Sequence, residues 1–563
     1  MLICVIRFVK GAFHMRAIPT GETLTIEFKS DRKKLPDNDL IDEVVGMSNT
    51  DGGMIYLGVE DDGEITGVHK QHADEIGVTA LIANRTVPSV FVRAELIEED
   101  GLPVLSISVP KGRSIVSSSD GRIVRRRLKI DGTPEIIPMY AYEIPGRLSN
   151  LSMLDYSAQI LQNAGYEDMD PYERQRLRRI IQTRNGDRSL LELSDEELDK
   201  ALRLVREENG VLYPTVTGML LIGKEDRLAE ILPTAKASFQ VLQGTAVRKN
   251  EQTNKPMLAV FELFEEYMNA WNPEREMEYG LVRVSIPEFS PTAFREGLVN
   301  AFSHRDYTIL QGIRVAVDDE GLTISSPGGF IDGVSLHNLL TVEPRSRNSV
   351  LSDALKRIGL AEKAGRGIDR IYEGSIVYGR PWPDYSESTD AYVKLFVQRA
   401  EPDLPFARMI ADEESRIGHS LPISSLLILS ALREHRRLKI RELAELINAN
   451  EIRTKAAVER LVESGLVEAT GNGKARSYIL SLKVYKKQEN TIGYVRQTGI
   501  DSVRYEALVI ELAEKQGGYI TRENVADLLK ITPDQAYKVL KAMVNKGKLI
   551  LEGRGRASKY RIG

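Results

Sequence analysis

The sequence predicts an α+β protein built from several domains. Its length, 563 residues, is enough for about three to five domains. Residues 22–68 read as strand, helix and hairpin, and a pattern of three short helices followed by a hairpin occurs twice in the last third of the chain. We expect domains at residues 15–142, 147–285, 286–400, 405–484 and 500–563.

The first predicted strand runs from Leu24 to Lys29, where apolar and polar residues alternate with the period of a half-buried strand. Glu27 and Lys29 therefore project from the same face, and a carboxylate lies beside an ammonium group. Apolar residues then recur at helical spacing from Asp39 to Met47. The sequence Asn-Thr-Asp-Gly-Gly at 49–53 ends this helix, because these residues tolerate the left-handed backbone of a helix C-cap or tight turn.

A short apolar strand, Met54 to Val59, and the acidic turn Glu60-Asp61-Asp62-Gly63 complete this unit. The combination of Glu22, Glu27-Phe28-Lys29, the 49–53 segment and Gly58-Val59-Glu60-Asp61 resembles the Schlafen/AlbA-like DNA-binding domain. Some Schlafen proteins are RNA endonucleases with a triad of acids. The resemblance implies catalytic roles for Glu22, Glu27, and Glu60 or Asp61, although this chain reads Gly-Val-Glu-Asp where those nucleases read Gly-Val-Asp-Asp.

Carboxylates can hold a divalent metal that activates water and offsets charge during phosphodiester cleavage. Candidate ligands for Mg²⁺ or Mn²⁺ are Glu22, Glu27, Glu60 and Asp61. Lys29 completes a carboxylate-plus-lysine layout that many metal nucleases use. The alternative is that Glu27 and Lys29 pair across one strand face, and that the domain only binds phosphate or nucleic acid.

Basic residues in the same domain are candidates for nucleic-acid contacts: Arg32, Lys33, Lys34, Arg125, Arg126 and Arg127. Three consecutive arginines on an extended segment offer bidentate phosphate contacts on both faces. The alternative is a solvated edge strand that its charges protect from pairing.

Beyond the first domain the pattern predicts a connecting α/β domain without candidate catalytic or binding residues. Helices are expected at Tyr172–Arg184 and Ser194–Glu208. Thr215–Lys224 reads either as an apolar strand or as a buried helix. A further strand is expected at Ala235–Leu242, and an amphipathic helix at Met257–Trp271.

A second informative block spans residues 291–378. Glu296 and Asn300 are four residues apart and therefore share one face of a predicted helix. Ser-Pro-Gly-Gly at 326–329 and Gly-Arg-Gly at 365–367 follow. This series resembles the divergent GHKL-type ATP-binding domain, an α/β sandwich, of RecG-like transcriptional regulators.

The resemblance implies that Asn300 holds the Mg²⁺ of bound ATP and that Glu296 can activate water. The glycines Gly328, Gly329, Gly365 and Gly367 would admit the nucleotide. In the family an acid that reads adenine precedes a Gly-x-Gly, whereas this chain has Ser-Pro-Gly-Gly. His304 could be a ligand or a base, or a structural residue.

The last third of the chain predicts two winged helices. The first has helices at Leu426–His435, Ile440–Ala449 and Thr454–Ser464, and the plan repeats roughly 80 residues later. The second copy is the more basic, and its candidate DNA contacts are Lys538, Lys541, Arg554, Arg556 and Lys559. Such residues neutralise phosphates while a recognition helix reads the major groove. The alternative is a winged helix used only for protein contacts.

Composition excludes some classes of protein. The net charge of −5 excludes a basic nucleic-acid coat, so that any nucleic-acid surface must be local. Cys4 is the only cysteine, which excludes an intramolecular disulfide framework and fits a cytoplasmic location. No apolar run is long enough to span a membrane. We also expect Met15 to be a possible start, and the protein to be a homo-oligomer.

These observations lead to three hypotheses. The first is a DNA-binding transcriptional regulator, modulated by a nucleotide or another ligand, with RNA as the other possible nucleic acid. The second is a metal-dependent RNA or DNA endonuclease, for example in phage defence. The third is an oligomeric scaffold.

Overall fold

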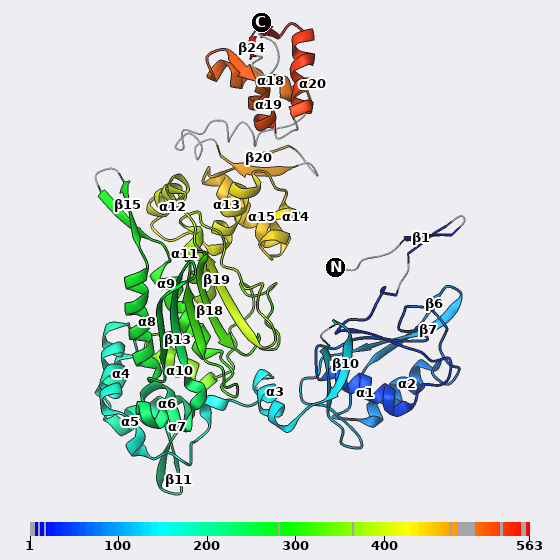
Figure 1. Cartoon of the computed structure of the whole chain (residues 1–563), viewed down its shortest axis with the longest axis vertical. Coiled ribbons are helices and arrows are strands. Elements are labelled where there is room, and N and C mark those ends of the chain that lie inside the picture. Colours follow the sequence, from blue (N-terminus) through cyan, green and yellow to red (C-terminus); the bar gives the residue numbers. More distant parts are fainter. Residues whose placement is uncertain are drawn as a thin grey trace. The chain divides into compact units, whose positions relative to one another are not determined.

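The computed structural model describes residues 6–9, 12–15, 18–129, 131–151, 153–279, 282–362, 365–471, 476–481, 502–529, 533–552 and 559–562. The chain divides into two compact units, Met1–Gln159 and Ile160–Gly563, and each is described by itself (Figure 1). Small mixed sheets and helices make up both units, which confirms the predicted α+β multidomain class.

The first unit is built on a four-stranded sheet with the order β3-β4-β7-β6. These strands cover Ile26–Lys29, Gly53–Leu57, Leu102–Val109 and Arg93–Glu99. β3 and β4 are parallel, so the chain needs a crossover between them, and helix α1 (Asp37–Ser48) supplies it. The strand, helix and second strand predicted for residues 24–59 are thereby confirmed.

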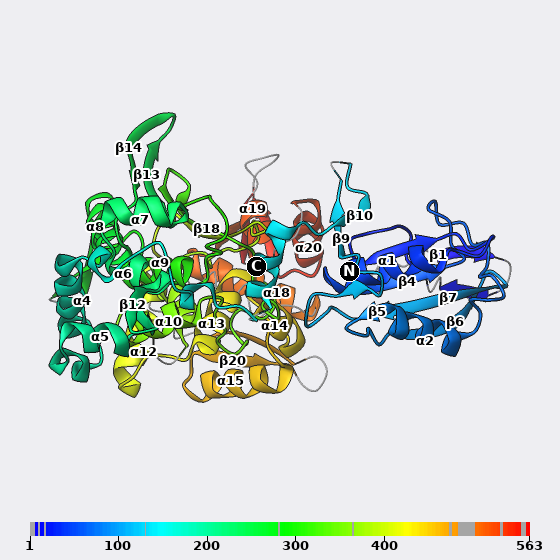
Figure 2. The same ribbon diagram turned by 90° about the horizontal axis from the view of Figure 1, so that it is seen from below.

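Apolar residues of α1 and of α2 (Glu75–Arg85) pack on one face of this sheet and form its main core. Gly53 lies where two strands approach closely, since a Cβ atom there would be 2.2 Å from the carbonyl oxygen of Thr25. The hairpin of β9 (Val124–Leu128) and β10 (Pro134–Pro138) packs against α1 and projects from this body in Figure 2.

The remaining elements of the first unit are short. They are β1 (Ile6–Val9), β2 (Ala12–Met15), β5 (Thr86–Val87), β8 (Ser117–Ser118), a 3-10 turn at Ala141–Glu143 and α3 (Ile144–Asn150).

The second unit contains a five-stranded sheet with the order β14-β13-β17-β18-β19, whose strands stand side by side in Figure 1. The strands cover Ala246–Thr253, Ala237–Gln243, Ile313–Val317, Gly321–Pro327 and Tyr392–Gln398. β13 is parallel to β17, so this sheet crosses the expected boundary between residues 285 and 286. Helices α8 (Met257–Trp271) and α9 (Pro291–Ser303) pack together through Phe261 and Phe302.

Helices precede this sheet in the chain, at α4 (Pro171–Thr183), α5 (Asp195–Ala201), α6 (Val216–Ile222) and α7 (Glu225–Ile231). The helix predicted for Ser194–Glu208 is wrong in its second half, which forms β11 (Val205–Glu208) paired with β12 (Val211–Pro214). Asn209 and Gly210 both have positive φ, which is typical of a tight hairpin turn. Of the two alternatives for Thr215–Lys224, the buried helix is confirmed, and the Thr215 side chain caps it.

Four more elements belong to this part of the chain. β15 (Glu274–Tyr279) and β16 (Val282–Pro287) form a hairpin, while α10 (Ser349–Arg357) and α11 (Gly367–Ile376) follow β18. α11 packs against α9 on one side and against α13 on the other.

Both predicted winged helices are confirmed. After α12 (Leu404–Ile417), the first consists of α13 (Ile423–His435), α14 (Ile440–Leu446), α15 (Glu451–Glu463), β20 (Val467–Thr470) and β21 (Ser477–Leu480). The second consists of α18 (Ser502–Lys515), β22 (Tyr519–Thr521), α19 (Arg522–Leu529), α20 (Pro533–Asn545), β23 (Leu549–Glu552) and β24 (Lys559–Ile562). Throughout the described ranges, every helix is too short or too polar to cross a membrane.

Candidate functional site

Four charged side chains form a closed network in the first unit. Glu27 and Lys29 share one face of β3, as predicted, and form an ion pair. Lys29 Nζ is also 2.9 Å from Glu43 Oε1. The Arg126 guanidinium reaches both acids, with Nη2 2.5 Å from Glu27 Oε2 and Nη1 3.4 Å from Glu43 Oε2. Two carboxylates are thus matched by two cations at a mostly buried position.

Glu43 was not among the residues predicted from sequence. Burial, and next the charge of Glu27, raise the pKa of Glu43 to about 7, although Lys29 and Arg126 oppose this shift. The sequence signal was available, because Glu43 lies among the apolar residues of the α1 face that packs on the sheet.

The expectation that Arg125, Arg126 and Arg127 all offer phosphate contacts is wrong for Arg126. Its side chain is buried between β9 and α1, where it pairs with Glu27 and Glu43. The strand alternation places Arg125 and Arg127 on the other face. Arg125 pairs with Glu143, and the exposed Arg127 pairs with Glu135.

The other acids with predicted catalytic roles have separate partners. Glu22 Oε1 accepts a hydrogen bond from the Phe28 amide at 3.0 Å, and burial raises the pKa of Glu22. Glu60 accepts hydrogen bonds from Thr66, Ser30 and Arg32, which together lower its pKa. Asp61 is exposed in the turn.

Among the described residues, no three His, Cys, Asp or Glu side chains lie close enough together to hold a metal ion. Glu22, Glu27, Glu60 and Asp61 do not form such a group there, although the charges of Glu27 and Asp61 add to the effect of burial in raising the pKa of Glu22, and metal binding by these acids stays a prediction. The two oxygens of Glu27 are instead occupied by Lys29 and Arg126.

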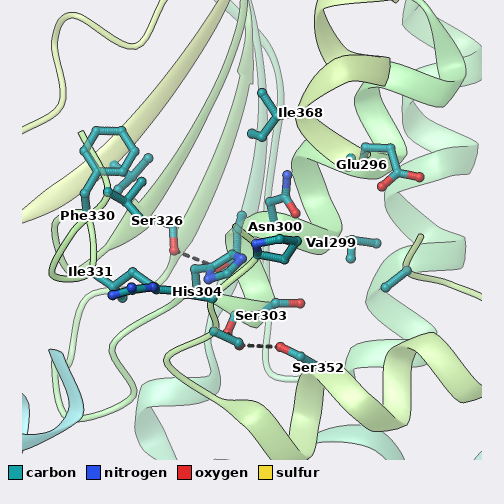
Figure 3. Close-up of a pocket in the computed structure, with 18 of the residues that line it drawn as sticks. Glu296, Val299, Asn300, Ser303, His304, Ser326, Phe330, Ile331, Ser352 and Ile368 are labelled. Atoms are coloured by element: carbon teal, nitrogen blue, oxygen red, sulfur yellow. Dashed lines mark hydrogen bonds between the residues drawn. The ribbon is translucent and has the colours of Figure 1, made fainter. Parts of the chain in front are cut away.

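A cavity of about 470 Å³ lies in the second unit. Its walls come from α9, α10, β18, β19 and the N-terminus of α11. All six residues predicted for nucleotide binding line it, namely Glu296, Asn300, Gly328, Gly329, Gly365 and Gly367. Figure 3 shows Phe330 and Ile331 across the cavity from Glu296.

One end of the cavity is polar. Glu296 is buried, and burial raises its pKa while the guanidiniums of Arg295 and Arg370, at 3.8 and 4.0 Å, oppose the rise. A Cβ atom at Gly367 would lie 3.1 Å from Glu296 Oε2 and 3.7 Å from the amide of Asn300. A side chain at position 367 would therefore crowd Glu296, and glycine lets the start of α11 approach this carboxyl group closely. Arg345 and Lys356 also line the cavity.

The glycine-rich wall is held by a buried arginine. Arg347 donates hydrogen bonds to the carbonyl oxygens of His304 and Gly329 at 2.9 and 2.8 Å. Gly328 has φ +92°, and a Cβ atom there would be 2.2 Å from Arg347 Nη1. Burial, and then Arg347, lower the pKa of His304 to about 4, so this imidazole is neutral at pH 7.

The hydroxyl of Ser326 stands near the position where the family carries the acid that reads adenine. It donates to the carbonyl oxygen of Ala301 at 2.7 Å. A serine held in this way does not replace a carboxylate as an acceptor for the adenine amino group.

The predicted DNA contacts of the second winged helix are only partly described. Lys538 and Lys541 are exposed on α20, and Lys559 is exposed on β24. Arg554 and Arg556 lie outside the described residues. In the first unit, Arg32 pairs with Glu60 and Glu64, Lys34 pairs with Asp37, and Lys33 is exposed.

Family models match four parts of the chain. The model "Schlafen, AlbA_2" matches residues 22–131 and "Putative ATP-dependent DNA helicase recG C-terminal" matches 311–396. "Winged helix-turn-helix DNA-binding" matches 423–468, and a domain of unknown function, DUF8451, matches 148–238. No curated protein matches the chain.

Among solved structures, the DIP2311 protein from Corynebacterium diphtheriae is 24% identical, with a TM-score of 0.51 over 84% of this chain and 95% of that chain. This likeness concerns the fold. A MarR family transcriptional regulator from Silicibacter pomeroyi DSS is 23% identical over 20% of this chain and 87% of that chain, with a TM-score of 0.12. The matched domains suggest nucleic-acid binding. The chain carries a Schlafen/AlbA_2 domain, a RecG C-terminal ATPase-like domain and a winged helix-turn-helix, as its sequence motifs predict.

Proposed function

We propose that the protein is a DNA-binding transcriptional regulator whose affinity for DNA depends on a nucleotide, ATP with Mg²⁺, in the cavity of the second unit. The observation that carries this proposal is the position of α11. Gly367, at its start, lines the cavity, and Ile376, at its end, belongs to the hydrophobic core of the first winged helix.

The residues present fit a nucleotide. The N-terminus of α11 offers backbone N–H groups to a phosphate, and Gly367 has no side chain that would block their approach. Arg345 and Lys356 supply positive charge. The oxygens of Asn300 and Glu296 are of the kind that bind Mg²⁺, which would neutralise phosphate charge.

The cavity also has apolar walls that suit a base. Ile324, Phe330 and Leu395 are among its lining residues, and they provide an apolar surface for a planar ring. Because Ser326 donates its hydroxyl to Ala301, we expect weak discrimination between adenine and guanine nucleotides.

The coupling passes through a shared core. Ile376 packs with buried residues of α13 and α15, and the half-buried Tyr372 packs against the same cluster. Trp382 Nε1 donates to the Ser430 hydroxyl of α13 at 2.9 Å, and Arg433 pairs with Asp403 at 3.1 Å. A nucleotide that favours one position of α11 therefore biases the position of α13.

The endonuclease alternative has less support. Both oxygens of Glu27 are occupied by Lys29 and Arg126, so a role as metal ligand or general base requires one of these ion pairs to open. Homo-oligomer formation and a cytoplasmic location stay predictions.

The experiment measures the affinity of purified protein for labelled duplex DNA by fluorescence anisotropy, with and without MgATP. We expect ATP to change the DNA affinity about 5- to 150-fold, the usual range of allosteric coupling. Asn300→Ala should abolish the ATP effect, whereas Asn250→Ala, on the exposed β14 strand, should preserve it. Bound ATP that leaves the DNA affinity unchanged would contradict the proposal.

A further inference from the structure

Two exposed tyrosines form a stacked pair in the first unit. The rings of Tyr140 and Tyr142 are 5.9 Å apart between centroids and only 6° from parallel. Tyr140 is 51% exposed and Tyr142 is 76% exposed. Tyrosine is enriched at binding surfaces because its ring packs against a partner while its hydroxyl stays hydrated, and a parallel pair presents a flat ring face to such a partner.

The pair is held in place by Glu143. One carboxylate oxygen of Glu143 accepts hydrogen bonds from Arg125, with Nε at 3.0 Å, and the other accepts from the Tyr140 amide at 2.9 Å. The same carboxylate thus ties the tyrosine turn to β9. The Tyr140–Tyr142 pair, called the aromatic platform below, is fixed in this way and therefore loses little conformational freedom when a ligand binds.

A row of cations leads away from this platform. Arg125 and Arg127 lie on one face of β9, Arg126 is buried on the opposite face, and the exposed Lys129 follows the end of the strand at Leu128. The Lys129 amide continues the ladder by donating to Thr133 at 2.8 Å. Residues two apart on a strand are separated by about 7 Å, which is comparable with the spacing of phosphates in an extended nucleic-acid strand.

The acids of the hairpin partly offset this row, since Glu135 pairs with Arg127, and hydrogen bonds from Thr133, followed by the charge of Lys129, lower the pKa of Asp131. Arg127 and Glu135 form an exposed pair, a type that contributes little to stability and can exchange its carboxylate for a phosphate. The Asp131 carboxylate accepts from the Thr133 amide and hydroxyl at 2.9 and 2.7 Å. Arg125 stays bound to Glu143 and acts as a positioning residue.

We infer that Tyr140 and Tyr142 bind an unpaired base of single-stranded nucleic acid, and that Arg127 and Lys129 bind its neighbouring phosphates. Aromatic platforms beside basic grooves bind single strands because every base offers a ring face. Bases inside a duplex are already stacked on each other, so the platform selects unpaired ones. The inference rests on the proposed function only in that the protein binds nucleic acid, and it does not need the nucleotide cavity.

The test compares the full-length protein with its Tyr140→Ala and Tyr142→Ala variants in binding a labelled 12-residue oligo(dT) and a labelled 20-base-pair duplex. Each substitution should weaken oligo(dT) binding about 5- to 150-fold, the loss expected for one stacked base, and leave duplex binding unchanged. Tyr142→Phe keeps the ring and should bind like the unchanged protein. Tyr172→Ala removes an exposed tyrosine of α4 in the second unit and serves as the matched control.

A second readout comes from Tyr142→Trp, whose added fluorescence should be quenched by oligo(dT) if a base stacks on the indole. Alanine variants that bind oligo(dT) as tightly as the unchanged protein would overturn the inference, as would an equal loss of duplex binding. A loss of self-association or protein capture, with oligo(dT) binding intact, would identify a protein-docking surface instead and also overturn it. Duplex binding without any oligo(dT) binding would overturn this inference while the proposed function stands. If the protein binds neither probe, both fail.

Discussion

Arg126 and Arg127 are neighbours in sequence, but the first side chain is buried and the second is exposed. Their substitution by alanine should therefore have different effects on stability. Arg126→Ala leaves Glu27 and Glu43 as buried acids without the guanidinium, which typically costs about 3–5 kcal/mol. Arg127→Ala removes an exposed ion pair and should change stability by about 0.5 kcal/mol or less. Hydrogen exchange of the α1 amides measures both effects in the full chain. Equal protection in the two variants would contradict the buried network.

Glu43 makes the stability of the first unit depend on pH. Its pKa in the folded chain is about 7, above its ordinary value of 4.5, so the folded state binds more protons between these values than the unfolded state does. Stability therefore falls as pH rises from about 4.5 to 7, by up to about 1.4 kcal/mol per pH unit.

Glu43→Gln imitates the protonated side chain and should remove this part of the pH dependence. The measurement is the difference in α1 hydrogen-exchange protection between the variant and the unchanged protein from pH 5 to pH 8. The variant should gain relative protection up to about pH 7 and then level off. A difference that stays constant over this range would show that Glu43 keeps an ordinary pKa.

Two lysines of the second winged helix, Lys541 and Lys546, can be compared to test whether α20 binds DNA. Lys541 is exposed on α20, whereas Lys546, just beyond that helix, and Lys548 pair with Glu506. Lys541→Ala should weaken duplex binding at all sequences and reduce the slope of log affinity against log salt by about 1. Lys546→Ala should have a smaller effect, because its charge is already partly neutralised. Equal salt slopes for the two variants would argue that α20 does not face the DNA backbone.

Helices and strands whose residues repeat with a clear helical or strand period could be predicted from the sequence. Alternation placed Glu27 and Lys29 on one face of β3, and the four-residue spacing placed Glu296 and Asn300 on one face of α9. The end of the Ser194–Glu208 prediction failed because the charged residues there suit a helix as well as an exposed hairpin. The Asn-Gly turn at 209–210 was the stronger signal.

Contacts between distant segments could not be predicted in this way. Glu43 and Arg126 are 83 residues apart, and nothing local in β9 shows which arginine will face α1. The six cavity residues were identified by family resemblance, since short glycine motifs are common in turns. The role of Arg347 could not be predicted either, because it depends on hydrogen bonds to His304 at the end of α9 and to Gly329 in the loop after β18.

Over the second unit as a whole, the cavity and the first winged helix share one helix, α11. Under the proposed regulation, a ligand shifts the equilibrium between two positions of α11 only by the difference in its affinity for them. Linkage also requires reciprocity, so that DNA must change the affinity for ATP by the same factor by which ATP changes the affinity for DNA.

Trp382→Phe tests this coupling, because it removes the indole donor to Ser430 while keeping an aromatic ring against the shared core. We expect the variant to bind ATP and duplex DNA separately with near-normal affinity, and to show a smaller coupling factor in both directions. The four affinities of the cycle, for each ligand with and without the other, measure it. A matched change outside the core, Ser386→Ala at an exposed position, should leave the factor unchanged. An unaltered factor in Trp382→Phe would mean that α11 and α13 move as one body without this hydrogen bond, and that the coupling lies in the apolar contacts of Ile376.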